Sequence, residues 1–185
     1  MARIQDMVWQ SLAWPSTVVH RQVVTAQAIE EHGIAAGKTD QGAVFAYEYK
    51  LLLTPAWEIK SANITSLLDE RTIALHHDAG TWRDAAGKTL HEFDGIPYID
   101  LSFSPFTNTL PIKRAPFVDD EELTIDTLYF DENSFSLTKV QQRYRRLGPK
   151  KYRYQDVETP DFTANIDVDD DGLVTDYQHL FARMR

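Results

Sequence analysis

Apolar and polar residues alternate with a period of two along most of this chain, which is typical of β-strands that bury one face. The clearest example is residues 43–53, where aromatic and aliphatic side chains alternate with Glu48 and Lys50. Residues 23–31 fit a helix nearly as well as two short strands joined near Gln27, and we favour strands. Similar patterns predict one strand that starts with Trp57 and Ile59. They also predict strands at residues 72–77, 96–103, 123–130, 135–147, 151–157, 162–168 and 173–177. Because turn residues separate these stretches and no strand–helix–strand rhythm is present, we expect an antiparallel sandwich, barrel or roll.

Residues 98–114 interrupt this pattern, because a strand-like start runs into a helix-start signal. We expect the Ser104 hydroxyl to cap free N–H groups of a short helix, with Pro105 at the first helical position, where a missing N–H costs nothing. Pro111 is expected to end this helix within about two turns. A short apolar helix in a β protein must be covered on several sides. The sequence therefore predicts a mainly β fold, a sheet wrapped around one short central helix.

Length and composition favour one domain, residues 1–185, because 43% hydrophobic content is enough for one substantial core. The absence of cysteine excludes disulfides, a thiolate nucleophile and cysteine-ligated metals. The N-terminus lacks the basic start and apolar run of a secretory signal, and no stretch approaches the roughly 20 apolar residues of a membrane-spanning helix. We therefore expect a cytoplasmic protein without integral membrane association.

The net charge of -9 argues against nucleic acid and anionic lipid surfaces as general partners. The charge is segregated along the chain, since residues 139–153 contain seven basic residues and no acidic one, whereas residues 119–122 are all acidic. The basic segment 139–153, with its interleaved tyrosines, has the composition to bind single-stranded nucleic acid or an anionic headgroup. We favour the alternative that its charges form a solvated outer face that balances the acidic rest of the chain.

Residues 167–172, Asp-Val-Asp-Asp-Asp-Gly, match the first half of a calcium-binding loop. The second half does not match, because Gln178 stands where the last ligand, a glutamate, belongs and strand-like segments flank the loop. We expect an exposed hairpin turn here, and no metal or other cofactor.

No catalytic constellation is visible. His76 and His77 point to opposite faces of a predicted strand, so we expect one to be half-buried and the other solvated. Ser104 sits at a strand-to-helix junction, loosely like a nucleophile elbow, but no G-x-S-x-G surrounds it. Nothing singles out a pair of carboxylates for glycoside chemistry. We therefore do not expect an enzyme.

The segment Ser-Pro-Phe-Thr-Asn-Thr-Leu-Pro-Ile-Lys-Arg at residues 104–114 resembles the bacterial putative glycolipid-binding family. Individually weaker matches lie in the right order over nearly the whole chain, at residues 82–88, 94–101, 142–144, 152–154 and 169–177. The resemblance implies a spiral β-roll, a long antiparallel sheet around a single helix, similar in shape to lipoprotein carriers and mycobacterial lipid-binding lipoproteins. It also implies binding of a lipid or glycolipid.

The leading hypothesis is a non-enzymatic carrier that holds an acyl chain or similar apolar ligand in the concave face of the roll, because each buried methylene contributes about 0.8 kcal/mol. The predicted ligand contacts are wall aromatics and headgroup-binding residues, namely Phe45, Tyr47, Trp57, Phe103, Phe106, Asn108, Thr109 and Arg114. The aromatic members are equally compatible with a plain core role. One alternative is an interaction or assembly module with a packed core and no ligand, and a less favoured one is a small-lipid or sugar hydrolase that uses Ser104. A homodimer is left open.

Overall fold

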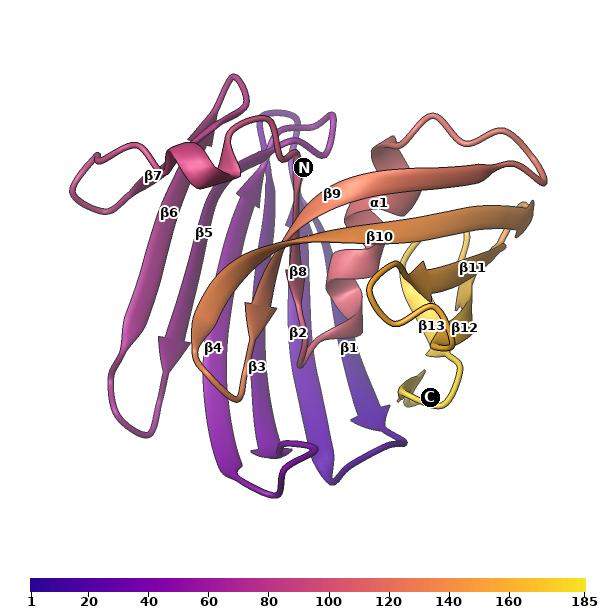
Figure 1. The fold of residues 1–185 in the computed structure, drawn as a ribbon, viewed down its shortest axis with the longest axis horizontal. Coiled ribbons are helices and arrows are strands. Elements are labelled where there is room, and N and C mark those ends of the chain that lie inside the picture. The colour runs from indigo at the N-terminus through magenta and orange to yellow at the C-terminus, as the bar shows by residue number, and fades with distance from the viewer.

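The computed structural model describes residues 1–185, which form one sheet of 14 strands curled around a short helical segment (Figure 1). The strands are β1 (Arg3–Ser11), β2 (Ser16–Val24), β3 (Ile29–Lys38), β4 (Val44–Leu53), β5 (Ile59–Ser66), β6 (Thr72–Asp78), β7 (Thr81–Asp84), β8 (Tyr98–Leu101), β9 (Glu122–Asp131), β10 (Ser136–Gly148), β11 (Lys151–Asp156), β12 (Thr163–Val168), β13 (Val174–Tyr177) and β14 (Phe181–Arg183). The helical turns are η1 (His91–Phe93), η2 (Pro105–Asn108) and α1 (Thr109–Arg114). The expected mainly β fold with one short helix is confirmed. No helix has the length and apolar character needed to cross a membrane.

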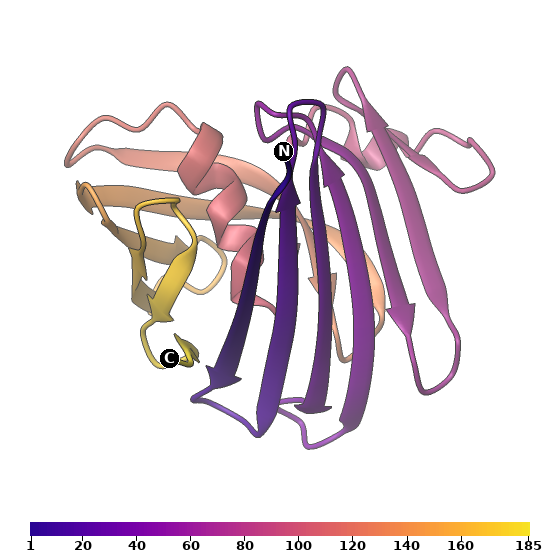
Figure 2. The same cartoon turned by 180° about the vertical axis from the view of Figure 1, so that it is seen from behind.

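The sheet has the order β7-β6-β5-β4-β3-β2-β1-β14-β13-β12-β11-β10-β9-β8, so its two edges are β7 and β8. The chain runs outward from β1 to β7, crosses to β8, and returns through β9–β14 until β14 pairs with β1. All neighbouring strands are antiparallel except β8 and β9, which are parallel. Figure 2 shows β1–β5 as one wall of long strands, with β9, β10 and the helical segment behind them.

The predicted alternation describes β4 well, since every second side chain from Phe45 to Leu53 is buried. The strand interpretation of residues 23–31 is also confirmed, because β2 and β3 are joined by a turn in which the Thr25 N–H donates to the Ala28 carbonyl. Trp57 was wrongly placed at the start of a strand. It lies in the turn before β5 with a positive φ of 63°, and the strand begins at Ile59.

The central helix is confirmed, and every side chain from Pro105 to Ile112 is buried. Two details of its prediction were wrong. Ser104 makes no capping hydrogen bond, because its hydroxyl lies against that of Tyr49. Pro111 does not end the helix, because it falls in the first turn of α1, where backbone N–H groups have no partner within the helix; α1 continues to Arg114.

A cluster of 37 buried hydrophobic residues fills the space between the curled sheet and the helical segment. Trp9 is fully buried, and its indole N–H donates to the Val174 carbonyl at 2.9 Å, which ties β1 to β13. Trp82 is also fully buried and donates to the Ile96 carbonyl at 2.9 Å. These two bonds satisfy the only polar atom of each indole and fix distant segments against the core.

The acidic run at residues 119–122, which leads into β9, lies beside the basic residues of β10. Arg146 is 3.3 Å from Asp119, Arg145 is 3.6 Å from Asp120, and Arg143 is 3.8 Å from Glu122. The basic segment therefore neutralises the acidic run next to it, which agrees with the favoured interpretation of a balanced outer face.

The acidic segment 167–172 forms the turn between β12 and β13, as expected. The Asp169 side chain closes this turn by accepting hydrogen bonds from the N–H groups of Asp171 and Leu173 and from the Arg183 guanidinium. The histidine prediction on β6 is also confirmed, since His76 is exposed and His77 is half-buried against the Trp82 ring.

Candidate functional site

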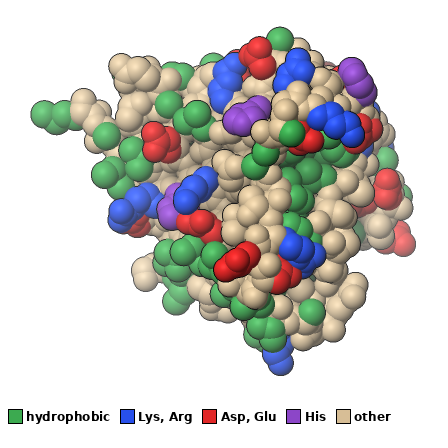
Figure 3. Space-filling view, turned by 90° about the vertical axis from the view of Figure 1, so that its left-hand side faces the viewer, with side chains coloured by type: hydrophobic (Ala, Val, Ile, Leu, Met, Phe, Trp, Pro, Cys, Tyr) green, Lys and Arg blue, Asp and Glu red, His purple; other side chains and the backbone are tan.

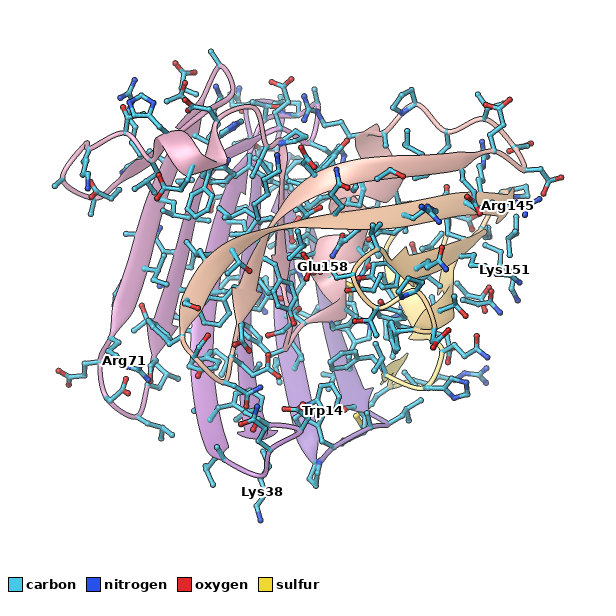
Figure 4. The ribbon with its side chains drawn as sticks, viewed as in Figure 1. Trp14, Lys38, Arg71, Arg145, Lys151 and Glu158 are labelled. Carbon is cyan, nitrogen blue, oxygen red and sulfur yellow. The ribbon has the colours of Figure 1, made fainter.

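A cavity of about 550 Å³ lies beside the helical segment and is the candidate functional site. Its wall combines residues from the β1–β2 connection, the β8–η2 loop, the β9–β10 hairpin, the β11–β12 connection and the C-terminal hairpin. Figure 4 labels two lining residues, Trp14 from the first of these segments and Glu158 from the β11–β12 connection. The volume falls within the roughly 300–1,000 Å³ that is usual for small-molecule sites.

Asp100 on β8 anchors the polar part of the wall. Its two carboxylate oxygens accept hydrogen bonds of 2.6 Å each from the Thr107 hydroxyl on η2 and from the Gln142 amide on β10. Burial raises the pKa of Asp100. Next to it, the Tyr144 hydroxyl donates to Asn108 Oδ1 at 2.8 Å, which holds the Asn108 side chain at the cavity wall. These hydrogen bonds fix the helix, β8 and β10 together, and three of the side chains involved, those of Asp100, Asn108 and Gln142, also line the cavity.

Glu132 follows β9 and lies at the cavity wall with only 7% of its surface exposed. Its backbone N–H donates to the Ser102 hydroxyl at 3.1 Å, and its carbonyl accepts from the Tyr47 hydroxyl at 2.8 Å. No other residue donates a hydrogen bond to its carboxyl group. Burial, followed by the nearby charges of Asp131, Asp40 and Asp100, raises the pKa of Glu132 to about 7.

The wall also has nine aromatic or aliphatic members, which are Trp14, Leu101, Tyr129, Val140, Tyr154, Phe162, Tyr177, Leu180 and Phe181. Carboxylate, amide and hydroxyl groups therefore face the same space as aromatic rings. Such a combination suits a ligand that has both hydrogen-bonding and apolar parts.

A chain of buried hydrogen bonds reaches this wall from the opposite side of the core. Glu31 on β3 lies 2.7 Å from His20 Nε2, and His20 Nδ1 lies 2.7 Å from the Tyr49 hydroxyl on β4. Tyr49 in turn lies 2.9 Å from the hydroxyl of Ser104, which lines the cavity. The Gln22 amide donates to the second Glu31 oxygen at 2.7 Å, so the carboxyl group is fully partnered.

Desolvation is the main cause of the pKa shifts of the ionisable groups in this series of hydrogen bonds. Burial raises the pKa of Glu31 to about 8 and lowers the pKa of His20 to about 3. Burial also raises the pKa of Tyr49 well above its usual value. Around neutral pH both members of the Glu31–His20 pair therefore favour their uncharged forms.

Of the eight predicted ligand contacts, Asn108 lines the cavity. Phe45, Tyr47, Phe103 and Phe106 are buried in the core cluster, where Tyr47 packs against the rings of Phe45 and Phe103. Their placement matches the core role that the sequence analysis left open for them.

The other three predicted contacts lie on or beside α1, outside the cavity wall. Thr109 is fully buried. Arg114 pairs with Glu58 at 2.9 Å, and the Lys113 ammonium lies 5.2 Å from the centre of the Trp57 ring. A ligand-binding role for these residues remains a prediction.

Sequence reasoning missed most of the cavity wall, because its residues come from segments far apart in the chain. One signal was present. Asp100 is a lone carboxylate in the otherwise uncharged stretch of residues 96–103, and a buried carboxylate in such a strand needs partners. Glu132 carried no comparable signal, since it sits among turn residues.

Residues 6–183 match the family model described as "Putative glycolipid-binding". The crystal structure of a DUF1089 family protein from Pseudomonas aeruginosa is similar, with a TM-score of 0.80 and 30% sequence identity. The similarity covers 90% of this chain and 92% of that one. No curated protein matches the sequence.

Proposed function

Because the chain belongs to the putative glycolipid-binding family, we propose that it binds a lipid or glycolipid and that the polar head of this ligand enters the cavity beside the helix. The observation that carries the proposal is the mixed character of the cavity wall, which has both polar and apolar side chains. Asp100, Asn108 and Gln142 offer hydrogen-bonding groups, while Tyr154 and Phe162 offer apolar surface. A glycolipid has the matching division into a hydroxyl-rich head and a hydrocarbon tail.

The charge of the cavity wall restricts which ligand heads can bind there. No lysine, arginine or histidine lines the cavity, so nothing there would neutralise a carboxylate or phosphate. An anionic head would also be repelled by the acidic side chains of the wall. We therefore propose a head that is not anionic, which argues against free fatty acids and phospholipids with net negative heads.

A binding role without catalysis is supported by the position of Ser104. Its hydroxyl reaches His20 only through Tyr49, so no base is in direct contact with it. The alternative of an interaction module with a fully packed interior is disfavoured by the presence of a cavity of about 550 Å³.

The test is a calorimetric titration with dodecyl glucoside below its micellar concentration. Native mass spectrometry of the purified protein accompanies it. Val140→Trp places a large ring in the cavity, and we expect it to weaken binding at least about tenfold, or about 1.4 kcal/mol. Val19→Trp is the matched control, because Val19 is 56% exposed and does not line this cavity. Equal binding by both variants would contradict the proposal, as would an absence of binding by the unmodified protein.

A further inference from the structure

The wall formed by β1–β4 has an outer face, which is turned away from the core and lies towards the viewer in Figure 2. On this face Val8 pairs with Val19, and Val19 pairs with Ile34. Met184 extends the row beyond β14, because its N–H donates to the Val8 carbonyl. Met184, Val19 and Ile34 are 58%, 56% and 42% exposed. We call this row of four apolar side chains the apolar ridge.

A second row runs beside the ridge, on the side of the β1–β2 turn. In it Gln10 pairs with both Ala182 and Thr17. Ala36 pairs with both Thr17 and Ala46, so three of the five members are alanines. The Gln10 side chain is held along the sheet, because it accepts a hydrogen bond from the Thr17 hydroxyl at 3.1 Å. This low row therefore forms a shallow trough beside the ridge.

Neither row carries a charge, although the chain as a whole has a net charge of -9. The charged row on the other side of the ridge is compensated, since Arg21 lies 2.7 Å from Asp6. Glu48, which pairs with Ile34 at the end of the ridge, lies 2.7 Å from His32 and 3.0 Å from Lys50. Figure 3 shows a neighbouring side of the molecule, where acidic and basic side chains lie among the apolar ones. Two copies of an acidic protein repel each other least where they meet through an uncharged surface.

The size pattern of the two rows indicates what covers them. An interface with two-fold symmetry uses the same surface on both copies, so this surface must be complementary to itself. A two-fold axis that crosses the strands between the two rows lays the ridge of each copy over the low row of the other. Each strand then lies over the same strand of the other copy, which gives the aligned packing of two sheets in a β-sandwich.

We propose that two copies of this chain associate through the apolar ridge and the low row, with Val19 of one copy against Thr17 of the other. Single exposed apolar residues are normal on a protein surface, whereas a contiguous group of them marks an interaction site. The association does not depend on the proposed function. It also leaves the ligand cavity free, because no residue of either row lines that cavity.

The first test measures self-association by sedimentation equilibrium over a series of protein concentrations. We expect a species of twice the 21.2 kDa chain mass. Ile34→Lys should weaken the dimer at least about tenfold, because it places a charge in an apolar interface. Leu52→Lys is the matched control, because Leu52 is 39% exposed on the same face of β4 but lies beyond the charged row, and it should keep the dimer. A protein that stays monomeric at every concentration would overturn the proposal and leave this face to another kind of partner, and equal effects of the two variants would also overturn it.

The second test examines the arrangement of the two copies. The chain has no cysteine, so one substitution introduces a unique thiol. A mixture of the Thr17→Cys and Val19→Cys proteins should be cross-linked by a short bismaleimide, and more efficiently than either protein alone, because like positions lie further apart across the proposed axis. Leu52→Cys should not be cross-linked. A dimer in which Thr17→Cys and Val19→Cys do not cross-link would overturn the proposed interface.

Discussion

His20 Nε2 lies 2.7 Å from Glu31 Oε2, and neither side chain has any surface exposed to solvent. Taking two ionisable groups out of water costs several kcal/mol for each group that stays charged, and a well-packed apolar pair at such a place is often as stable or more so. Uncharged forms held by hydrogen bonds reduce this cost. The pair is also linked through the Tyr49 hydroxyl to Ser104 at the cavity wall, so hydrogen bonds connect two buried ionisable groups of the core to the candidate site.

The first prediction concerns the pH dependence of the free energy of unfolding. The pKa of Glu31 is raised from 4.5 to about 8, so between these values the unfolded chain gives up a proton that the folded protein keeps, and the contribution of Glu31 to stability falls as pH rises. Glu31→Gln removes this contribution. We expect the stability of Glu31→Gln relative to the unmodified protein to rise by roughly 1.4 kcal/mol per pH unit over that window.

Urea unfolding at a series of pH values between 4.5 and 8 measures this difference. A difference that stayed constant with pH would show that Glu31 titrates normally in the folded protein. Glu30→Gln, at an exposed position on β3, serves as the control.

The second prediction concerns Tyr49→Phe, which deletes the hydroxyl between His20 and Ser104. Both partners would then lack a buried hydrogen bond, so we expect a loss of about 1–3 kcal/mol in the free energy of unfolding. Tyr98→Phe is the control, because Tyr98 is also buried but takes no part in this hydrogen-bonded chain. Equal losses for the two variants would mean that the chain contributes nothing beyond ordinary packing.

The third prediction concerns Gly33, which faces the Tyr49 ring across the β3–β4 pair. A Cβ at this position would overlap the Tyr49 ring and hydroxyl. Gly33→Ala must therefore displace Tyr49, and overpacking of this kind costs about 1–3 kcal/mol. Gly148→Ala has open space around its Cβ and should be close to neutral. Thermal unfolding of both variants tests this prediction, and unchanged stability of Gly33→Ala would contradict it.

The fourth prediction concerns Asp100→Asn. The carboxylate accepts hydrogen bonds at both oxygens, whereas an amide would turn one of its own donors towards the Thr107 hydroxyl or the Gln142 amide. We expect a loss of about 1–3 kcal/mol. Asp126→Asn, which removes a partly exposed ion pair with Lys139, should cost less than about 1 kcal/mol. If the two losses were the same, the hydrogen bonds of Asp100 would contribute no more to stability than a partly exposed ion pair does.

The sequence was sufficient for the elements that depend on local patterns. The alternation of β4 and the helix signal at Ser104-Pro105 predict a mainly β protein with its sheet wrapped around one short helix. The errors are also local. The sequence predicts a helix stop at Pro111, but proline is tolerated in a first helical turn; it predicts a strand start at Trp57, but this residue lies in a turn.

The candidate site depends on register and on long-range pairing, which a period-two pattern does not contain. His20 and Glu31 meet because Gln22 pairs with Glu31 and His20 with Gly33 on the neighbouring strand. Asp100 meets Gln142 because the chain crosses from β7 to the far edge of the sheet before it turns back. Neither contact is visible in a single sequence.

The pairing of β14 with β1 joins Trp9 to Arg183 and Ser11 to Phe181, residues from the two ends of the chain. During synthesis β1 leaves the ribosome long before β14, so one side of β1 has no partner until residues 181–183 have emerged. The complete sheet, and the cavity wall that Phe181 helps to form, can assemble only after that point. Until then β1 offers unpaired backbone groups to other strands, which makes the nascent chain dependent on protection from aggregation.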